Sequence, residues 1–370
     1  MSFVRKENRT VVVGMSGGVD SSVTAAILLD EGYNVIGVTM KTYDFDEVGG
    51  NVANEASCCG LGAINDARLV AAKLGIPHYV VDFREAFGRA VIDNFVSEYL
   101  EGRTPNPCVI CNREIKWGQL LQKAEALGAD CIATGHYARI RFDETRGRHV
   151  ISRGLYERKD QSYALWAVRQ DALKKTMFPL GDKTKPEVRE LARTYGLRNA
   201  AKDDSYEICF VADNKYERFL KERIPGLEQQ TAGGNIVAGK EVVGTHRGYP
   251  FYTIGQRNGL GAHGKRMYVT GIERATNTVR IGPASELLHT SLLAGSVNWS
   301  GISRPETDLR VQARVRYKDE GAAATVKQLP DGKIQVIFDE PKRAITPGQS
   351  VVLYDGDDLL GGGLIEDVSD

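Results

Sequence analysis

The sequence has few cysteines and methionines, and it carries no excess charge of either sign. It contains 6 Cys and 5 Met in 370 residues, and its 48 basic residues are matched by 48 acidic ones. Six cysteines over this length do not form a disulfide framework, so we expect reduced thiols and a cytoplasmic protein. A net charge of zero excludes a protein that coats nucleic acid indiscriminately, although it is compatible with a local basic surface.

Long hydrophobic runs are also missing. No apolar stretch approaches the roughly 20 residues of a membrane span, so no membrane association is expected. The first apolar run, TVVVGM at residues 10–15, comes too early to leave room for a targeting segment. The length predicts two or three domains.

The first half of the chain alternates between the patterns of strands and helices. Strands are expected at 10–15, 33–40, 78–83 and 131–135, and helices at 21–31, 62–74, 84–100 and 115–127. Such alternation predicts a parallel sheet with helices on both faces. Another helix is expected from Thr184-Lys-Pro-Glu187, which has the spacing of a capping box, to Gly196.

From about Thr231 onward, short alternating runs are separated by turn residues, which predicts one or two barrel-like β modules. Examples are KEVVGTH, FYTIG, RMYVTGI and NTVRIG. The run 309–318 predicts a strand with Arg310, Arg314 and Arg316 on one face and Tyr317 on the other. We therefore expect a domain at 1–212, a β-rich domain at 213–285 and a barrel-like domain at 286–370.

The segment VVVGMSGGVDSSVTAA, residues 11–26, joins the first strand to the first helix. Its glycines and helix start predict a phosphate cradle, the plain alternative being a tight turn. It lacks G-K-[ST] and G-x-G-x-x-G, so neither a Walker loop nor a nicotinamide site is expected. It resembles the S-G-G-x-D-S loop of the ATP pyrophosphatase (PP-loop) family. That resemblance implies cleavage of ATP to AMP and pyrophosphate, with Asp20 positioning Mg²⁺ or holding the loop. The implied nucleotide-binding residues are Gly14, Met15, Ser16, Gly17, Gly18, Val19, Asp20 and Ser21.

Cys108 and Cys111 form a C-x-x-C pair behind Pro105 and Pro107. The pair alone leaves open a metal, a redox couple, covalent sulfur chemistry or simple packing. Together with GMSGGVDSS, ATGHYAR, KDQSY, EICF, TIGQRNGLG and ITPGQSVV, the segment GRTPNPCVICNREIKWG resembles the bacterial tRNA-specific 2-thiouridylases over nearly the whole chain.

This resemblance implies that Cys111 and Cys209 are the catalytic pair. ATP would adenylate the 2-carbonyl oxygen of the wobble uridine in the anticodon stem-loop of tRNA. A persulfide on Cys209, loaded by a cysteine desulfurase or a sulfur-relay protein, would then supply sulfur. We expect Arg113, Lys116 and a helix start near Ile115 to favour the thiolate.

Cys108 is a departure from the family pattern, in which many relatives have Asp at this position. A thiol is a poorer general base, so the acid–base role of this position is in doubt. Cys108, Cys111 and Cys209 together would offer three soft ligands, which suits an iron–sulfur cluster. Persulfide chemistry, a cluster and inert packing therefore stay open. Cys58 and Cys59 are expected to be plain buried or loop residues, and Cys131 a core residue.

The same resemblance assigns further contacts. Met40 and Gly135 would touch ATP, and Asn106, Pro107 and Cys108 would border the target uridine. The implied tRNA contacts are His136, Lys159, Asp160, Gln161, Arg316, Tyr317 and Gln349, against plain alternatives of polar loops and a solvated strand. Two rival functions are a PP-loop ligase or amidotransferase, and a nucleotide-regulated RNA-binding protein without turnover.

Overall fold

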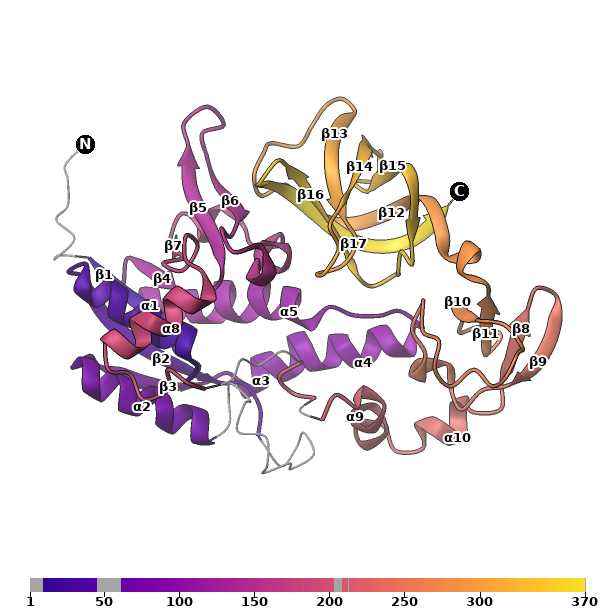
Figure 1. Ribbon diagram of the computed structural model, residues 1–370, viewed down its shortest axis with the longest axis horizontal. Coiled ribbons are helices and arrows are strands. Elements are labelled where there is room, and N and C mark those ends of the chain that lie inside the picture. Colours follow the sequence, from indigo (N-terminus) through magenta and orange to yellow (C-terminus); the bar gives the residue numbers. More distant parts are fainter. Residues whose placement is uncertain (1–8, 45–60, 203–207, 212, 370) are drawn as a thin grey trace. The chain divides into compact units, whose positions relative to one another are not determined.

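The computed structural model describes residues 9–44, 61–202, 208–211 and 213–369 (Figure 1). These residues divide into two compact units. The first draws on 1–91, 108–214 and 357–359, and the second on 92–107, 215–356 and 360–370.

The first unit is built on a five-stranded sheet in the order β3–β2–β1–β4–β7. The strands are β1 Thr10–Gly14, β2 Asn34–Lys41, β3 His78–Asp82, β4 Cys131–Ala133 and β7 Thr176–Met177. Every neighbouring pair is parallel, so Val12 faces Ile36 in β2 and Ile132 in β4. The predicted parallel sheet is confirmed, and the carboxyl ends of its strands share one edge.

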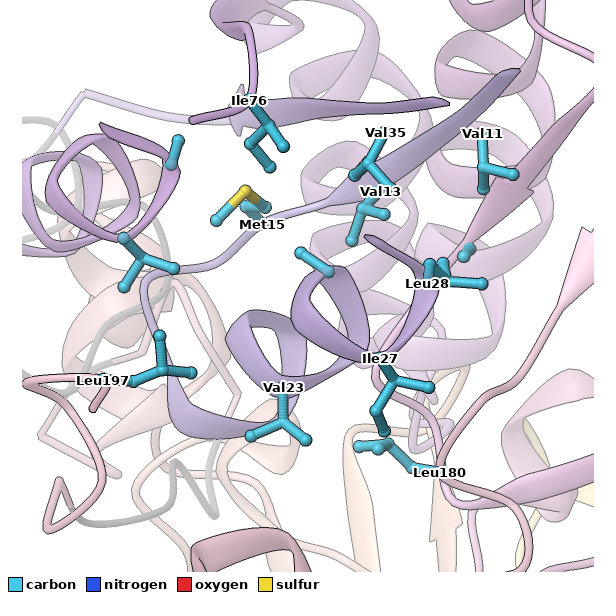
Figure 2. Close-up of a cluster of buried hydrophobic side chains, with 14 of the residues drawn as sticks. Val11, Val13, Met15, Val23, Ile27, Leu28, Val35, Ile76, Leu180 and Leu197 are labelled. Atoms are coloured by element: carbon cyan, nitrogen blue, oxygen red, sulfur yellow. The ribbon is translucent and has the colours of Figure 1, made fainter. Parts of the chain in front are cut away.

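Helices cover both faces of this sheet, as the sequence predicts. On one face lie α1 Val19–Asp30, α2 Leu61–Leu74 and α8 Lys185–Thr194. Figure 2 shows Val11, Val13 and Val35 on the side of the sheet that faces α1, whose Val23 and Ile27 point away from the sheet, with Ile27 next to Leu180, all within one buried cluster. On the other face, Trp117 Nε1 donates to Thr176 Oγ1 of β7 at 2.7 Å. A Cβ added at Gly14 would lie 3.5 Å from Leu120 Cδ2, an ordinary van der Waals distance, so the end of β1 packs against the helix that contains Leu120.

The helix that contains the C-x-x-C pair begins earlier than expected. It comprises α5 Pro107–Ile110, a π-helical segment Cys111–Leu120 and α6 Leu121–Ala126. The predicted start near Ile115 is therefore wrong. Pro107 is the first residue of the helix and does not prevent a helix from forming there. Proline suits the first helical position, where its missing N–H has no partner to lose. In the described part of the chain, no helix is both long and apolar enough to cross a membrane.

The stretch expected as one helix at 84–100 is helical throughout, but it is not uniform. It consists of α3 Arg84–Phe87, a π-helical turn Gly88–Ile92 and α4 Asp93–Leu100. Shorter helices follow later in the chain: α7 Gln170–Leu173, α9 Tyr216–Arg223 and α10 Leu227–Thr231.

The predicted capping box of α8 is confirmed. Thr184 Oγ1 accepts from the backbone N–H of Glu187, and the Glu187 carboxylate accepts from the backbone N–H of Thr184 at 2.6 Å. Pro186 occupies the first turn. These contacts fix the start of α8 and therefore the position of Lys185, its first residue.

Replacing Thr184 with alanine should lower the free energy of unfolding by about 1 kcal/mol, because the backbone N–H of Glu187 loses its acceptor and the Glu187 carboxylate loses the hydroxyl that donates to it. Thr194→Ala is the matched control, since its hydroxyl donates only to the exposed Glu190 carbonyl in the last turn. Urea unfolding of both variants measures the difference. Equal stabilities would contradict the assignment of the cap.

The second unit contains the predicted β modules. One sheet has the order β10–β11–β8–β9. Its strands are β8 Asn235–Ala238, β9 Glu241–Thr245, β10 Tyr268–Glu273 and β11 Thr278–Gly282. FYTIG was predicted as a strand, but Tyr249–Phe251 is a 3₁₀ turn and the residues after it are turns.

Six further strands form an antiparallel barrel, which is closed by pairing of β12 with β17. They are β12 Leu288–Asn298, β13 Leu309–Arg314, β14 Ala322–Gln328, β15 Ile334–Arg343, β16 Ser350–Asp355 and β17 Asp358–Ser369. Its core includes Val311, Val336 and Leu353, all buried. The run predicted as a strand to residue 318 ends at Arg314. Tyr317 is consequently exposed beside Arg316, and it does not lie on the inward face.

A hairpin of β5 Ala138–Asp143 and β6 Arg148–Arg153 completes the first unit. Asp358 pairs with Ser152 of β6, and its carboxylate receives hydrogen bonds from Arg141 and the Ser152 hydroxyl. These contacts hold the hairpin to residues 357–359, which belong to the same unit.

Candidate functional site

The loop after β1 leads directly into the start of α1. Met15 N–H donates to Val38 O of β2 at 2.8 Å, and Ser16 N–H donates to Ser21 Oγ at 3.1 Å. The hydroxyls of Ser21 and Ser22 both donate to Gly18 O. Gly18 caps α1 without a side chain, so no side chain satisfies the first-turn amides. Such a helix start favours an anion.

Two glycines are required by close approaches at this loop. Gly17 has φ +71°, and a Cβ there would lie 2.2 Å from the Ala63 carbonyl oxygen of α2. A Cβ at Gly135, just after β4, would lie 2.9 Å from Ser21 N. The structure therefore brings Gly135 against the start of α1, at the sheet edge where β2 ends near Met40.

Asp20 is the charged centre of the loop. Its Oδ1 accepts from Tyr137 OH at 2.9 Å and from Lys185 Nζ at 2.6 Å. Lys185 is buried, and its ammonium also lies 5.9 Å from the centroid of the Tyr137 ring. In this structure Asp20 holds the loop to α8 and to the segment after β4.

Sequence reasoning missed Lys185, Tyr137 and Asn199. The Asn199 Nδ2 donates to Gly17 O at 3.1 Å and to Ser22 Oγ at 2.8 Å, and its Oδ1 is buried without a partner. Lys185 lies inside the capping box and was interpreted only as part of a helix start. Asn199 has no local signal at all, because its partners lie far away in the chain.

His136 is buried beside the Cys111 helix. Lys116 Nζ, which can only donate, lies 3.3 Å from His136 Nε2, so Nδ1 bears the proton and donates to Thr134 Oγ1 at 2.6 Å. Burial, aided by the Lys116 charge, lowers the pKa of His136 well below its usual value. A neutral imidazole here holds Lys116 on the helix that contains Cys111.

His136 should make the protein less stable in acid. The unfolded chain takes up a proton on this imidazole below about pH 6.5 and the folded chain does not, so stability falls as pH falls below that value. The loss is at most about 1.4 kcal/mol per pH unit. His136→Gln should show a shallower decline in urea unfolding between pH 7 and 5. Parallel declines would contradict the buried neutral histidine.

The cysteines differ in exposure. Cys108 is exposed in the first turn of the helix, Cys111 and Cys209 are half-buried, and Cys131 is in the core as expected. Tyr43 OH donates to the Cys209 carbonyl at 2.6 Å. All four are thiols in the structure. Cys58 and Cys59 lie outside the described residues.

The earlier helix start changes the electrostatics of the C-x-x-C pair. Cys108 lies in the first turn, where the helix dipole favours a thiolate, while Cys111 lies a turn further in. Cys111 opens the π-helical segment, an irregularity that is frequent at functional sites. The dipole therefore acts more directly on Cys108 than on Cys111.

The three cysteines do not form a metal-ligand set. Among the described residues, no group of three His, Cys, Asp or Glu side chains is arranged to hold a metal ion. Cys108, Cys111 and Cys209 as placed in this structure thus do not fit an iron–sulfur cluster.

Two of the predicted tRNA contacts make internal hydrogen bonds. The buried Asp160 carboxylate accepts from the N–H groups of Gly154 and Ser162 and from the Ser162 hydroxyl. Gln161 Oε1 accepts from Tyr137 N–H at 3.0 Å. Lys159 is half-buried in the 3₁₀ turn that precedes them. Asp160 and Gln161 therefore shape this loop.

In the second unit, Gln349 holds the chain just before Asn106. Its Nε2 donates to Thr104 O and Pro105 O, each at 3.0 Å, and Thr104 N–H donates to Pro347 O at 2.9 Å. Asn106 is half-buried and Pro107 is buried. The barrel loop thus fixes the backbone of Thr104 and Pro105 within the second unit.

Arg316 and Tyr317 are displayed on a turn that a buried carboxylate organises. Asp319 accepts from the N–H groups of Val315 and Gly321, and it pairs with Lys342 at 2.6 Å. Both displayed side chains are exposed. Because β13 ends at Arg314, neither residue lies on the strand face to which the sequence prediction assigned it.

Three family profiles match the chain. Residues 9–213 match the tRNA methyl transferase HUP domain, 217–283 its PRC-barrel domain, and 289–365 the aminomethyltransferase beta-barrel domain. A solved 4-thiouridine synthetase bound to RNA and ATP is 18% identical, with a TM-score of 0.37, over 59% of this chain and 51% of that one. Similarity at that level carries no conclusion.

Relatives with about half of their residues identical are more informative. The tRNA-specific 2-thiouridylase MnmA of Salinibacter ruber is 54% identical over 97% of this chain and 94% of the relative. Those of Carboxydothermus hydrogenoformans and Heliobacterium modesticaldum are each 51% identical, over 97% and 96% of this chain and 98% and 92% of theirs. The chain belongs to the tRNA-specific 2-thiouridylase family.

Proposed function

We propose that this protein is an ATP-dependent sulfurtransferase that converts the wobble uridine of certain tRNAs to 2-thiouridine. The observation that carries the proposal is one compact unit containing both an uncapped helix start after β1 and the half-buried thiols Cys111 and Cys209. The names of the relatives support the same reaction. The three-part division at 1–212, 213–285 and 286–370 is part of the proposal.

The first step is activation of the base. The 2-carbonyl oxygen of uridine attacks the α-phosphorus of ATP, which forms an adenylated uridine and releases pyrophosphate. The amides of Gly17, Gly18 and the first turn of α1 would bind the phosphates, and the backbone of Met40 and Gly135 would contact the nucleotide. Lys185 stabilises the loop through Asp20.

The second step transfers sulfur. The Cys111 thiolate attacks the inner sulfur of the Cys209 persulfide, which forms a Cys111–Cys209 disulfide and releases hydrosulfide. Hydrosulfide attacks C2 of the adenylated uridine and displaces AMP. A cellular dithiol must then reduce the disulfide, and a cysteine desulfurase or sulfur-relay protein must reload Cys209. A reducing compartment such as the cytoplasm suits this cycle.

Mg²⁺ would enter with the nucleotide. Magnesium is commonly held by substrate phosphates and one or two carboxylates, with water filling the other positions. Asp20 has a second carboxylate oxygen that fits this role, since Tyr137 and Lys185 donate to its Oδ1. The ion would neutralise charge on the leaving pyrophosphate.

The target uridine must leave its stack to reach the thiols. We propose that Asn106, Pro107 and Cys108 border it, and that His136, Lys159, Arg316 and Tyr317 contact the RNA. Asp160, Gln161 and Gln349 would then act by shaping the loops around these contacts, because their side chains hydrogen-bond to backbone groups.

The test is a stoichiometric assay of nucleotide products. With unmodified tRNA, AMP and pyrophosphate should appear in equal amounts, and both should be lost when the wobble uridine is replaced by cytidine. Pyrophosphate release without any change in the tRNA would favour another PP-loop ligase. Binding of both ligands without turnover would favour a nucleotide-regulated RNA-binding protein.

A further inference from the structure

Tyr43 lies just beyond β2 and contacts the segment that contains Cys209. Its ring is buried, with 4% of the side chain exposed. Its hydroxyl donates to the Cys209 carbonyl at 2.6 Å, across a sequence separation of 166 residues. This short contact fixes the backbone atom next to the Cys209 side chain.

An aromatic cluster strengthens the same attachment. The Tyr43 and Phe87 ring centroids are 6.0 Å apart, and Phe87 meets Phe210 edge-on at 5.8 Å and 78°. Phe87 and Phe210 are both buried. The turn is tight, since Val211 N–H donates to Ile208 O at 2.9 Å. The backbone on both sides of Cys209 is therefore anchored, while its thiol keeps partial exposure.

We propose that Tyr43 is a positioning residue for the sulfur-transfer step, which holds Cys209 so that its persulfide meets the Cys111 thiolate. This inference rests on the proposed function. The Cys111 sulfur must approach Cys209 Sγ in line with the S–S bond that breaks, opposite the departing outer sulfur, and small misplacements of reacting groups slow such steps strongly. Tyr43 touches neither nucleotide nor substrate in this account, so base activation does not depend on its hydroxyl.

Tyr43→Phe separates the two steps, because it keeps the ring in the cluster and removes only the hydroxyl. Protein loaded with one persulfide would be mixed with tRNA and ATP for a single turnover, with pyrophosphate and 2-thiouridine both measured. Pyrophosphate release should stay within about twofold of wild type. Thiolation should fall about three- to tenfold, the range expected for one hydrogen bond, with the missing sulfur still present as the persulfide on Cys209.

Tyr195→Phe is the matched control, since its hydroxyl donates to the exposed Asp30 carboxylate at 3.5 Å, away from both cysteines in sequence. It should leave both rates unchanged. Amide hydrogen exchange provides a second measure: Tyr43→Phe should speed exchange at residues 208–211 and not in β1. Wild-type thiolation by Tyr43→Phe, or an equal fall in both steps, would overturn the inference. If wild-type protein itself makes neither pyrophosphate nor 2-thiouridine, the proposed function fails instead.

Discussion

Cys111→Ser and Cys209→Ser should each abolish 2-thiouridine formation, by at least about 10³-fold, while both variants still release pyrophosphate in the first turnover. Serine keeps the size of the side chain but cannot hold a sulfane sulfur or attack one. The two variants should differ in what accumulates. Cys209→Ser should take up no sulfur from the donor, whereas Cys111→Ser should keep its persulfide undischarged. Mass spectrometry of the intact protein and of the tRNA nucleosides measures both outcomes.

Cys131→Ala and Cys108→Ala are the controls for these two variants. Burial raises the pKa of Cys131, and such a thiol is inert, so its loss should affect stability more than chemistry. Cys108→Ala should retain persulfide loading on Cys209. Activity that survives in either serine variant would contradict the paired-cysteine mechanism. Iron that is present in anaerobically purified wild type but absent from Cys108→Ala, Cys111→Ser and Cys209→Ser would instead support an iron–sulfur cluster.

Gly17→Ala should weaken ATP binding by about 100-fold. The added Cβ meets the Ala63 carbonyl at 2.2 Å, so the loop or the start of α2 must shift, and the backbone amides of the loop would lose their alignment on the phosphates. Isothermal titration with a non-hydrolysable ATP analogue measures the affinity. Thermal unfolding in the absence of nucleotide measures the stability of the same samples.

Gly75→Ala separates steric contact from backbone strain. Gly75 has φ +69°, close to the +71° of Gly17, but a Cβ there would have no heavy atom within 4 Å. Both substitutions put alanine in the left-handed region, at a similar cost of about 1–2 kcal/mol. Only Gly17→Ala should lose nucleotide affinity. Equal affinities in the two variants would show that Gly17 does not shape the phosphate site.

The parts of the fold that were predictable from sequence have local signals. The buried runs that became β1 and β2 are short and apolar, and the capping box at Thr184 is a four-residue pattern. The parallel sheet follows from the alternation of such segments. The strand–loop–helix order at Gly14–Ser22 was predictable for the same reason.

Glycine and proline account for the main errors in the fold. The strand β17 was missed because DLLGGGLIEDVS has the composition of a turn. Gly361 and Gly363 are required by close contact with the neighbouring strand β12, since a Cβ would lie 2.5 Å from Asn298 O and 2.9 Å from Gly295 O, respectively. Pro107 was predicted to precede the helix, but it is the first residue of the helix. In both cases the tertiary context decides what the residue does.

The residues missed at the site act over long sequence separations. Tyr137 and Lys185 reach Asp20 across 117 and 165 residues, and Tyr43 reaches Cys209 across 166. No periodicity or motif encodes such pairs. The thiols and the glycine-rich loop were predictable because each forms a local sequence motif. The residues that position them are common residue types, and only the folded structure brings them into contact.

The central claim is that this chain transfers sulfur to the wobble uridine from its own Cys209. The most direct test loads the protein with ³⁵S persulfide, removes the donor, and adds unmodified tRNA and ATP for one turnover. Labelled 2-thiouridine at the wobble position, formed only with ATP and never by Cys209→Ser, is the predicted result. Label that stays on the protein or leaves only as sulfide, while wild-type enzyme consumes ATP, would contradict the account.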